Sequence, residues 1–270
     1  MKFKQGTMIK GKDLKGQILC KVLTEDMIMK GFQYHVGENV DINPLAKEGS
    51  CRAGLHFCLI EDILDFLCYG IKLANVEIPE NEDVYVDENK FRTHRLIVKE
   101  IFLLNKPEAW EYLISQGIDI TADDKYAVRY ASENGHLDVV KYLHKNGTDI
   151  TAANNYAVRL SAQFGHLDVV KYLHENGADI TADSNCAVRY ASENGHLDVV
   201  KYLHANGADI TADDNYAVKW SAENGHLDVV KYLHANGADI TADDNYAVRW
   251  SARNGYQDVV DYLLANGAHL

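Results

Sequence analysis

Apolar residues recur with two different spacings along this chain of 270 residues. In the C-terminal part they follow a helical period, and within 137–145 Val139, Val140 and Leu143 fall on one face. A shorter helical run at 126–134 precedes that segment and ends at a glycine, a residue suited to the turn after a helix. The pattern predicts pairs of short helices.

The helical pattern repeats every 30 residues. The 25 residues NGHLDVVKYLHANGADITADDNYAV begin at Asn194 and return unchanged at Asn224, and half a copy at 105–117 precedes the full copies. Two short helices and a turn cannot bury their apolar faces alone, so neighbouring copies must stack. We predict a mainly α solenoid over 105–270. Its five full copies lie at 118–147, 148–177, 178–207, 208–237 and 238–267.

Residues 1–104 lack this period and predict a small α+β domain. An apolar run at 60–69 predicts a helix. The segment Arg95–Leu104 has two interpretations, a strand of this domain or the missing first helix of the half copy. Short apolar runs bounded by turn residues predict strands at 17–23, 31–37, 72–78, 83–86 and 95–103.

The recurring run Gly-His-Leu-Asp-Val-Val-Lys-Tyr-Leu-(x)3-Gly-Ala-Asp resembles the second helix and exit turn of the ankyrin repeat. Ankyrin repeats usually have about 33 residues and open the first helix with T-P-L-H-x-A. Here that position reads Tyr-Ala-Val-Arg-Tyr-Ala, from Tyr126 to Ala131. The missing residues fall where the family forms its β-hairpin finger, so the resemblance implies shortened fingers.

Thirty-residue copies of this kind resemble the ankyrin families encoded by giant DNA viruses of amoebae. The N-terminal domain is similar to the segment that often precedes such arrays, and no activity follows from that similarity. The resemblance implies a viral protein-protein interaction module that acts in the host cytoplasm on a protein of the host cell.

Two rows of variable side chains on the first helices are the candidate binding surface. In the ankyrin geometry they lie toward the concave face that the family commonly uses, and large aromatic residues beside basic ones are typical of binding hot spots. Alternatively, the aromatic residues only pack between repeats and the basic residues only neutralise the acidic turns. The candidate partner-binding residues are Arg129, Tyr130, Arg159, Leu160, Arg189, Tyr190, Lys219, Trp220, Arg249 and Trp250.

Histidine and cysteine are arranged in ways that do not favour metal sites. Equivalent histidines of stacked copies, such as those of the His136 row, would lie about 8–10 Å apart, too far for one ion to bridge. We expect His136 to hydrogen-bond the loop between helices and Cys186 to be a small buried side chain. Five cysteines at irregular spacings predict free thiols, and no zinc spacing joins Cys51, His56, Cys58 and Cys68.

Composition narrows the classes of partner. The net charge of −13 disfavours nucleic acid. No apolar stretch approaches the roughly 20 residues of a membrane span, and no secretory signal is visible. We expect a monomer.

In the last copy Tyr256-Gln257 replaces His-Leu and Asp261 replaces Lys, a polar change typical of a C-terminal cap.

No nucleotide, hydrolase or metalloprotease motif occurs, so we expect a non-enzymatic protein without a cofactor. The alternative is an N-terminal head that binds a ligand and is targeted by the array. His35 and the run Gly54-Leu55-His56-Phe57 faintly resemble the core of the ADP-ribosyltransferases, in which a histidine and a G-x-Y-F strand hold NAD. The spacing here is shorter than in that family.

Overall fold

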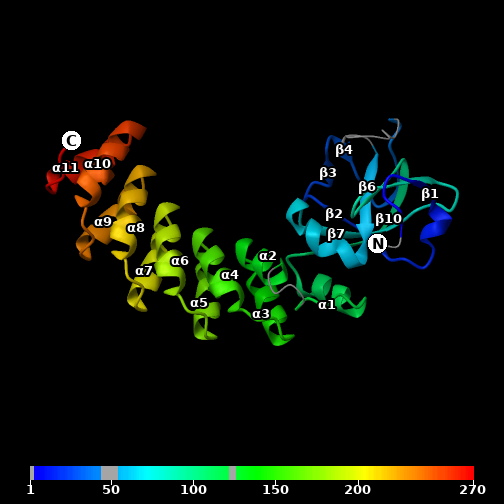
Figure 1. Cartoon of the computed structure of the whole chain (residues 1–270), viewed down its shortest axis with the longest axis horizontal. Coiled ribbons are helices and arrows are strands. Elements are labelled where there is room, and N and C mark those ends of the chain that lie inside the picture. Colours follow the sequence, from blue (N-terminus) through cyan, green and yellow to red (C-terminus); the bar gives the residue numbers. More distant parts are fainter. Residues whose placement is uncertain (1–2, 44–53, 122–125) are drawn as a thin grey trace. The chain divides into compact units, whose positions relative to one another are not determined.

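The computed structural model describes residues 3–43, 54–121 and 126–270, which form two compact units, Met1–Ala122 and Asp123–Leu270 (Figure 1). The first unit is rich in strands and the second consists of paired helices. The predicted fold class, an α+β head followed by a helical solenoid, is confirmed. Helix α1 (Pro107–Ser115) lies 30 residues before α3 (Leu137–Lys145), at the place of the predicted half copy, and belongs to the first compact unit.

The head is built on one eight-stranded antiparallel sheet. Its strand order is β1-β8-β9-β6-β2-β7-β10-β5, and β3 with β4 forms a separate hairpin. The strands are β1 (Met8–Lys10), β2 (Leu19–Leu23), β3 (Ile28–Met29), β4 (Phe32–Gln33), β5 (Gly37–Val40), β6 (Leu55–Leu59), β7 (Lys72–Glu77), β8 (Asp83–Val86), β9 (Phe91–Thr93) and β10 (Arg95–Leu103).

The segment with two interpretations is a strand, because Arg95–Leu103 pairs with β5 on one side and β7 on the other. The predicted helix at 60–69 is present as η2 (Ile60–Tyr69), a 3₁₀ helix that packs on β2 and β6. A shorter 3₁₀ turn, η1 (Gly11–Leu14), follows β1.

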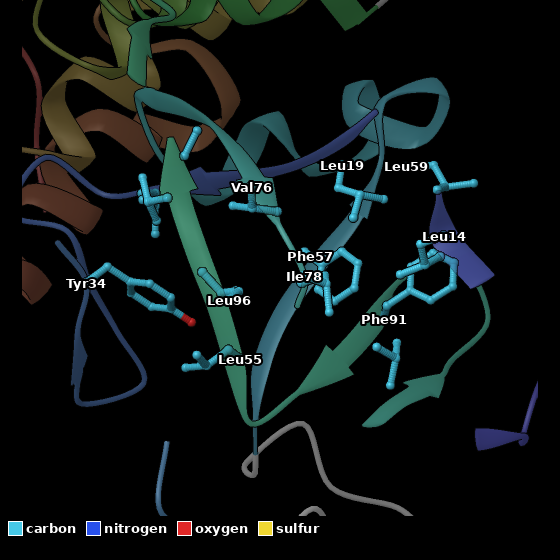
Figure 2. Packing of buried hydrophobic residues seen from close by; sticks show 14 of the residues in the cluster. Leu14, Leu19, Tyr34, Leu55, Phe57, Leu59, Val76, Ile78, Phe91 and Leu96 are labelled. Carbon is cyan, nitrogen blue, oxygen red and sulfur yellow. The ribbon is translucent and has the colours of Figure 1, made fainter. Parts of the chain in front are cut away.

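Aromatic and aliphatic side chains from most of these strands form the core of the head (Figure 2). Phe57 of β6 stacks on Phe91 of β9 with 5.3 Å between ring centroids. Tyr34, just after the β3–β4 hairpin, belongs to the same cluster as Leu55 and Leu96. The cluster thus ties the hairpin to the sheet.

The array contains two rows of helices (Figure 1). Neighbouring first helices contact each other far more extensively than neighbouring second helices do. The first helices are α2 (Tyr126–Glu133), α4 (Ala152–Gln163), α6 (Ala182–Glu193), α8 (Ala212–Glu223) and α10 (Ala242–Asn254); the second are α3, α5 (Leu167–Glu175), α7 (Leu197–Ala205), α9 (Leu227–Ala235) and α11 (Gln257–Ala265).

A continuous apolar seam runs between the two rows. In the third copy Val199, Val200 and Leu203 are fully buried, and the equivalent residues of the other copies are buried likewise. Burying apolar surface contributes about 25 cal/mol per Å². Each copy therefore depends on its neighbours for most of its stability.

The turn between copies has a left-handed backbone. Three successive residues in each of four turns have φ between 52 and 59°, for example Asp183, Ser184 and Asn185. Aspartate and asparagine tolerate this left-handed region better than other residues with a side chain. The third one is always asparagine, and its Oδ1 accepts the backbone N–H of the next copy, as in Asp209 N to Asn185 Oδ1 at 2.9 Å. The described residues of the array contain no strand, in keeping with shortened fingers.

Candidate functional site

A ladder of aromatic rings runs along the first helices of the last two copies. Tyr216 stacks on Trp220 with centroids 5.2 Å apart, Trp220 lies 6.0 Å from Tyr246, and Tyr246 lies 5.6 Å from Trp250. Arg253 extends the ladder, because its guanidinium lies 4.6 Å from a ring centroid of Trp250. Both tryptophans are partly exposed, so their rings present apolar surface beside a cation.

The exposure of the row that contains these tryptophans changes along the array. Tyr130 and Leu160, at its start, are 8% and 7% exposed and belong to the core. Burial raises the pKa of the Tyr130 hydroxyl to about 12. Tyr190, Trp220 and Trp250 are partly exposed instead. The row therefore offers a surface only from the third copy onward.

The basic row pairs with the acidic turns. Arg159 binds Asp183, and Arg189 binds Asp213 at 2.5 Å. Lys219 lies between the carboxylates of its own turn and of the next. The pairs between copies each span 24 residues, so a first helix is joined to the turn of the following copy.

The same basic side chains lie over tyrosine rings and are largely covered. Arg129 lies 4.8 Å from the ring centroid of Tyr156, and Arg189 lies 5.0 Å from that of Tyr216. The side chains of Arg159, Arg189 and Lys219 are 14%, 13% and 11% exposed, whereas that of Arg249 is 46% exposed. Arg249 also pairs with its own turn, at 3.7 Å from Asp244 and 3.2 Å from the carbonyl oxygen of Asp243, but it is the exposed member of this row.

Two rows of histidines join successive copies by hydrogen bonds. Nε2 of His166, the equivalent of His136 one copy later, bonds to the backbone carbonyl of Glu133 at 2.9 Å. Glu133 is the last residue of α2, so this bond joins two copies and differs from the expected bond to the loop between helices. Nδ1 of His174 bonds to the hydroxyl of Tyr202 at 2.8 Å, and three equivalent pairs occur. In the described part of the chain no three His, Cys, Asp or Glu residues are placed to hold a metal ion.

The head contains a cavity of about 230 Å³ that sequence reasoning did not identify. Lys21 of β2 lines it and is only 5% exposed. Its Nζ donates a hydrogen bond to the carbonyl oxygen of His56 at 2.7 Å and lies 4.6 Å from the ring centroid of Tyr34. Burial lowers the pKa of Lys21 from 10.5 to about 7. The signal in the sequence was a lysine inside an apolar strand, Leu-Cys-Lys-Val-Leu.

His56 and Tyr34 also line this cavity. Burial and the nearby lysines lower the pKa of His56 to about 3, so its ring is neutral near pH 7. Burial and the neighbouring Asp41 raise the pKa of Tyr34. Asp41 itself is held by neighbours: its carboxylate accepts hydrogen bonds from the amide and side chain of Asn43 and from the amide of Gly54.

The residues of the ADP-ribosyltransferase resemblance do not line one cavity together. Gly54, His56 and Phe57 line the cavity, whereas His35 is exposed and does not. The backbone N–H of His35 donates to Asn39 Oδ1 at 2.9 Å and its carbonyl accepts the Asn39 amide at 2.8 Å, which fixes a turn.

The described cysteines are free thiols. Cys20 and Cys58, on paired strands, have Sγ atoms 3.7 Å apart, and burial raises the pKa of Cys20. Cys186 is buried, as expected, and Cys68 is exposed. Cys51 lies outside the described residues.

The array and the head each match a known protein family. The family described as "Ankyrin repeats (3 copies)" matches residues 130–214 and 189–270, which together exceed half of the chain. A "Domain of unknown function (DUF7666)" matches residues 17–108. No described helix is long and apolar enough to cross a membrane.

Similar proteins are encoded by Acanthamoeba polyphaga mimivirus. Two that are named as ankyrin repeat proteins are 32% identical over 133 residues and 37% identical over 130 residues. These alignments cover 45% and 46% of this chain, and only 43% and 39% of the relatives. An uncharacterised protein of the same virus is 29% identical over 131 residues, covering 46% of this chain and 95% of that protein. The period, the paired helices and the family match together show that this chain belongs to the ankyrin repeat family.

Proposed function

We propose that the ankyrin array binds a protein partner through the first-helix face of its last three copies. Ankyrin repeats are protein-protein interaction modules, which supports this class of function. The aromatic ladder from Tyr216 to Trp250 is the observation that carries the finer proposal. Tyr190, Trp220 and Trp250, with Arg249 and Arg253, would form its centre.

The geometry of the array supports this face. Its first helices contact each other more extensively than its second helices, as expected for the inner row of a curved array. A concave surface surrounds a partner and removes more apolar area from water than a flat one. Tryptophan and arginine at the centre of such a surface are the residues that most often carry binding energy.

The chemistry of the face favours a partner with apolar and acidic groups. Trp220 and Trp250 would pack against apolar side chains, and Arg249 and Arg253 would pair with carboxylates. The remaining surface is acidic, with a net charge of −13 for the chain, which argues against nucleic acid. We propose a protein of the host cell, bound by a monomer in the host cytoplasm, because the relatives are viral.

The first test is co-purification of the whole chain with proteins of an Acanthamoeba lysate. The double variant Trp220→Ala and Trp250→Ala should lose a recovered protein at least tenfold, since hot-spot truncations cost about 2 kcal/mol or more. The matched control is Lys201→Ala with Lys231→Ala, two exposed residues of the second helices. Equal recovery with both double variants, each with an unchanged unfolding midpoint, would refute the proposal.

A second proposed role concerns the head. The cavity around Lys21 favours a ligand-binding head that the array delivers to its partner. We therefore propose that the two units have different roles: the array recognises a protein, and the head recognises a small molecule.

A further inference from the structure

The cavity of the head contains the buried amino group of Lys21, which forms no ion pair with any described residue. Lys21 is 5% exposed, and its Nζ bonds to a neutral carbonyl oxygen, that of His56. A buried ammonium without a counter-ion costs free energy, and an anion that enters the site would offset that cost.

The carboxylate on the cavity wall does not fill this role. Asp41 Oδ1 accepts hydrogen bonds from Asn43 N at 3.0 Å and Asn43 Nδ2 at 2.7 Å, and Oδ2 accepts one from Gly54 N at 3.2 Å. These three donors hold the Asp41 carboxylate within its own turn. The cation of Lys21 therefore remains available to a ligand.

Further cations surround the cavity, although the chain as a whole is acidic. Lys30 and Lys90 line it together with Lys21. Arg92 is paired with Asp87 at 2.9 Å and does not line the cavity, but its charge adds to theirs in disfavouring a charged His56 ring. The cavity is therefore a cationic site in a chain with net charge −13.

The rest of the cavity wall is apolar and aromatic. Phe57, Phe66 and Tyr69 contribute rings, and Val22 and Met29 contribute aliphatic surface. A volume of about 230 Å³ exceeds the roughly 150 Å³ of an apolar protein cavity that binds benzene. The space fits a ligand with one ring and one charged group.

We propose that this cavity binds a small organic anion of one-ring size, whose carboxylate or phosphate accepts a hydrogen bond from Lys21 Nζ and whose ring packs against Phe57 and Phe66. The inference rests on the ligand-binding role proposed for the head and names its chemical class. It is independent of the partner of the array.

Binding of an anion would be linked to uptake of a proton. The pKa of Lys21 is about 7, so near pH 8 most of the free protein carries a neutral amine at this position. An anion favours the ammonium form, raises this pKa, and therefore binds more tightly at pH 6 than at pH 8. The other titratable groups that line the site are Lys30 and Tyr34 by the β3–β4 hairpin, Asp41 after β5, His56 and Cys58 of β6, Cys20 of β2, Tyr69 of η2 and Lys90 before β9.

The test is calorimetric titration of the full chain with benzoate, phenyl phosphate and the neutral benzyl alcohol. At least one anion should bind more tightly than benzyl alcohol, and the comparison of the two anions distinguishes a carboxylate from a phosphate ligand. Benzoate affinity should fall about tenfold from pH 6 to pH 8, with proton uptake at pH 8.

Variants test which charged side chain is responsible for anion binding. Lys21→Met should weaken anion binding at least tenfold and leave benzyl alcohol binding intact, since a charge-assisted hydrogen bond is lost. Lys15→Met, an exposed residue that does not line the cavity, is the matched control. Should Lys21→Met fail to fold, the Lys21 side-chain NMR signal of the unaltered chain still reports whether benzoate raises its pKa.

Three results would overturn the inference. Benzyl alcohol that binds as tightly as both anions would leave a ligand-binding head but remove the anionic class. Anion binding unchanged in Lys21→Met would remove the role of Lys21. The absence of binding by all three probes would overturn the ligand-binding role of the head as well.

Discussion

The recurring Gly-His pair shows how single residues set the stacking of this array. Gly195 has φ of +78°, and a Cβ atom placed there would lie 2.6 Å from Nδ1 of His226 in the next copy. Gly165 meets His196 in the same way, and Gly225 meets the ring of Tyr256. Glycine is therefore required at this position for two reasons: the backbone is left-handed, and a ring of the next copy packs against the Cα atom.

A matched pair of substitutions separates these two requirements. Gly207 also has a left-handed backbone, with φ of +98°, but no atom lies within 4 Å of the position of its Cβ. Gly207→Ala should cost about 1 kcal/mol of unfolding free energy through backbone strain, and Gly195→Ala about 1–3 kcal/mol more through the clash. Thermal unfolding by circular dichroism measures the difference. Equal midpoints for the two variants would show that the close approach to His226 is absent.

Sequence reasoning was least complete at the residue scale. The sequence places basic residues on the first helices and acidic residues in the turns. The choice between ion pairing and partner binding required the distances from Arg159 and Arg189 to their carboxylates. Lys21 was missed because a lone lysine in a strand is normally exposed. Here β2 is buried along its whole length, between β6 and β7 and under η2, and this depends on contacts distant in sequence.

Elements were predicted well wherever an apolar period was strong. The second helix of the first full copy, 137–145, was predicted with the bounds that the structure has, and the helix at 60–69 and the strand at 83–86 were also recovered. The segment 95–103 could not be decided from the sequence, because an apolar run of that length is compatible with a strand or a helix. Its pairing with both β5 and β7 decides for the strand.

The turn between copies is the element that the sequence did not predict. Aspartate and asparagine indicate a turn, but three successive left-handed residues are stable only with the support of the next copy. Asn185 supplies that support, since its Oδ1 accepts the backbone N–H of Asp209 at 2.9 Å. The conformation of the turn is thus a property of two adjacent copies.

Substitutions of Asn185 test this account of the turn. Asn185→Ala should lower the unfolding free energy by about 1–3 kcal/mol, because it loses the acceptor and tolerates positive φ poorly. Asn185→Asp keeps an acceptor oxygen and should cost less, and Asn185→Gly keeps the backbone freedom alone and should fall between them. Chemical denaturation of the three variants gives the order. A glycine variant as stable as the unaltered chain would show that the hydrogen bond to Asp209 contributes nothing.

At the scale of the whole molecule, the 30-residue period was enough to predict a solenoid and to separate it from a head of different architecture. The period could not indicate where the array offers a free surface. That depends on how far each aromatic side chain is covered by its neighbours, which buries Tyr130 and Leu160 and leaves Trp220 and Trp250 partly exposed. The cavity of the head has no counterpart in the repeat pattern at all.

The central claim is that a protein partner lies against the first-helix face of the last copies. Site-specific photocrosslinking tests it most directly, with a benzophenone amino acid in place of Trp250 on that face or of Lys231 on a second helix, in the full chain within Acanthamoeba cells. We predict a covalent adduct with a defined host protein from position 250 and none from position 231. An adduct from position 231 alone, or the same adduct from both positions, would contradict the claim.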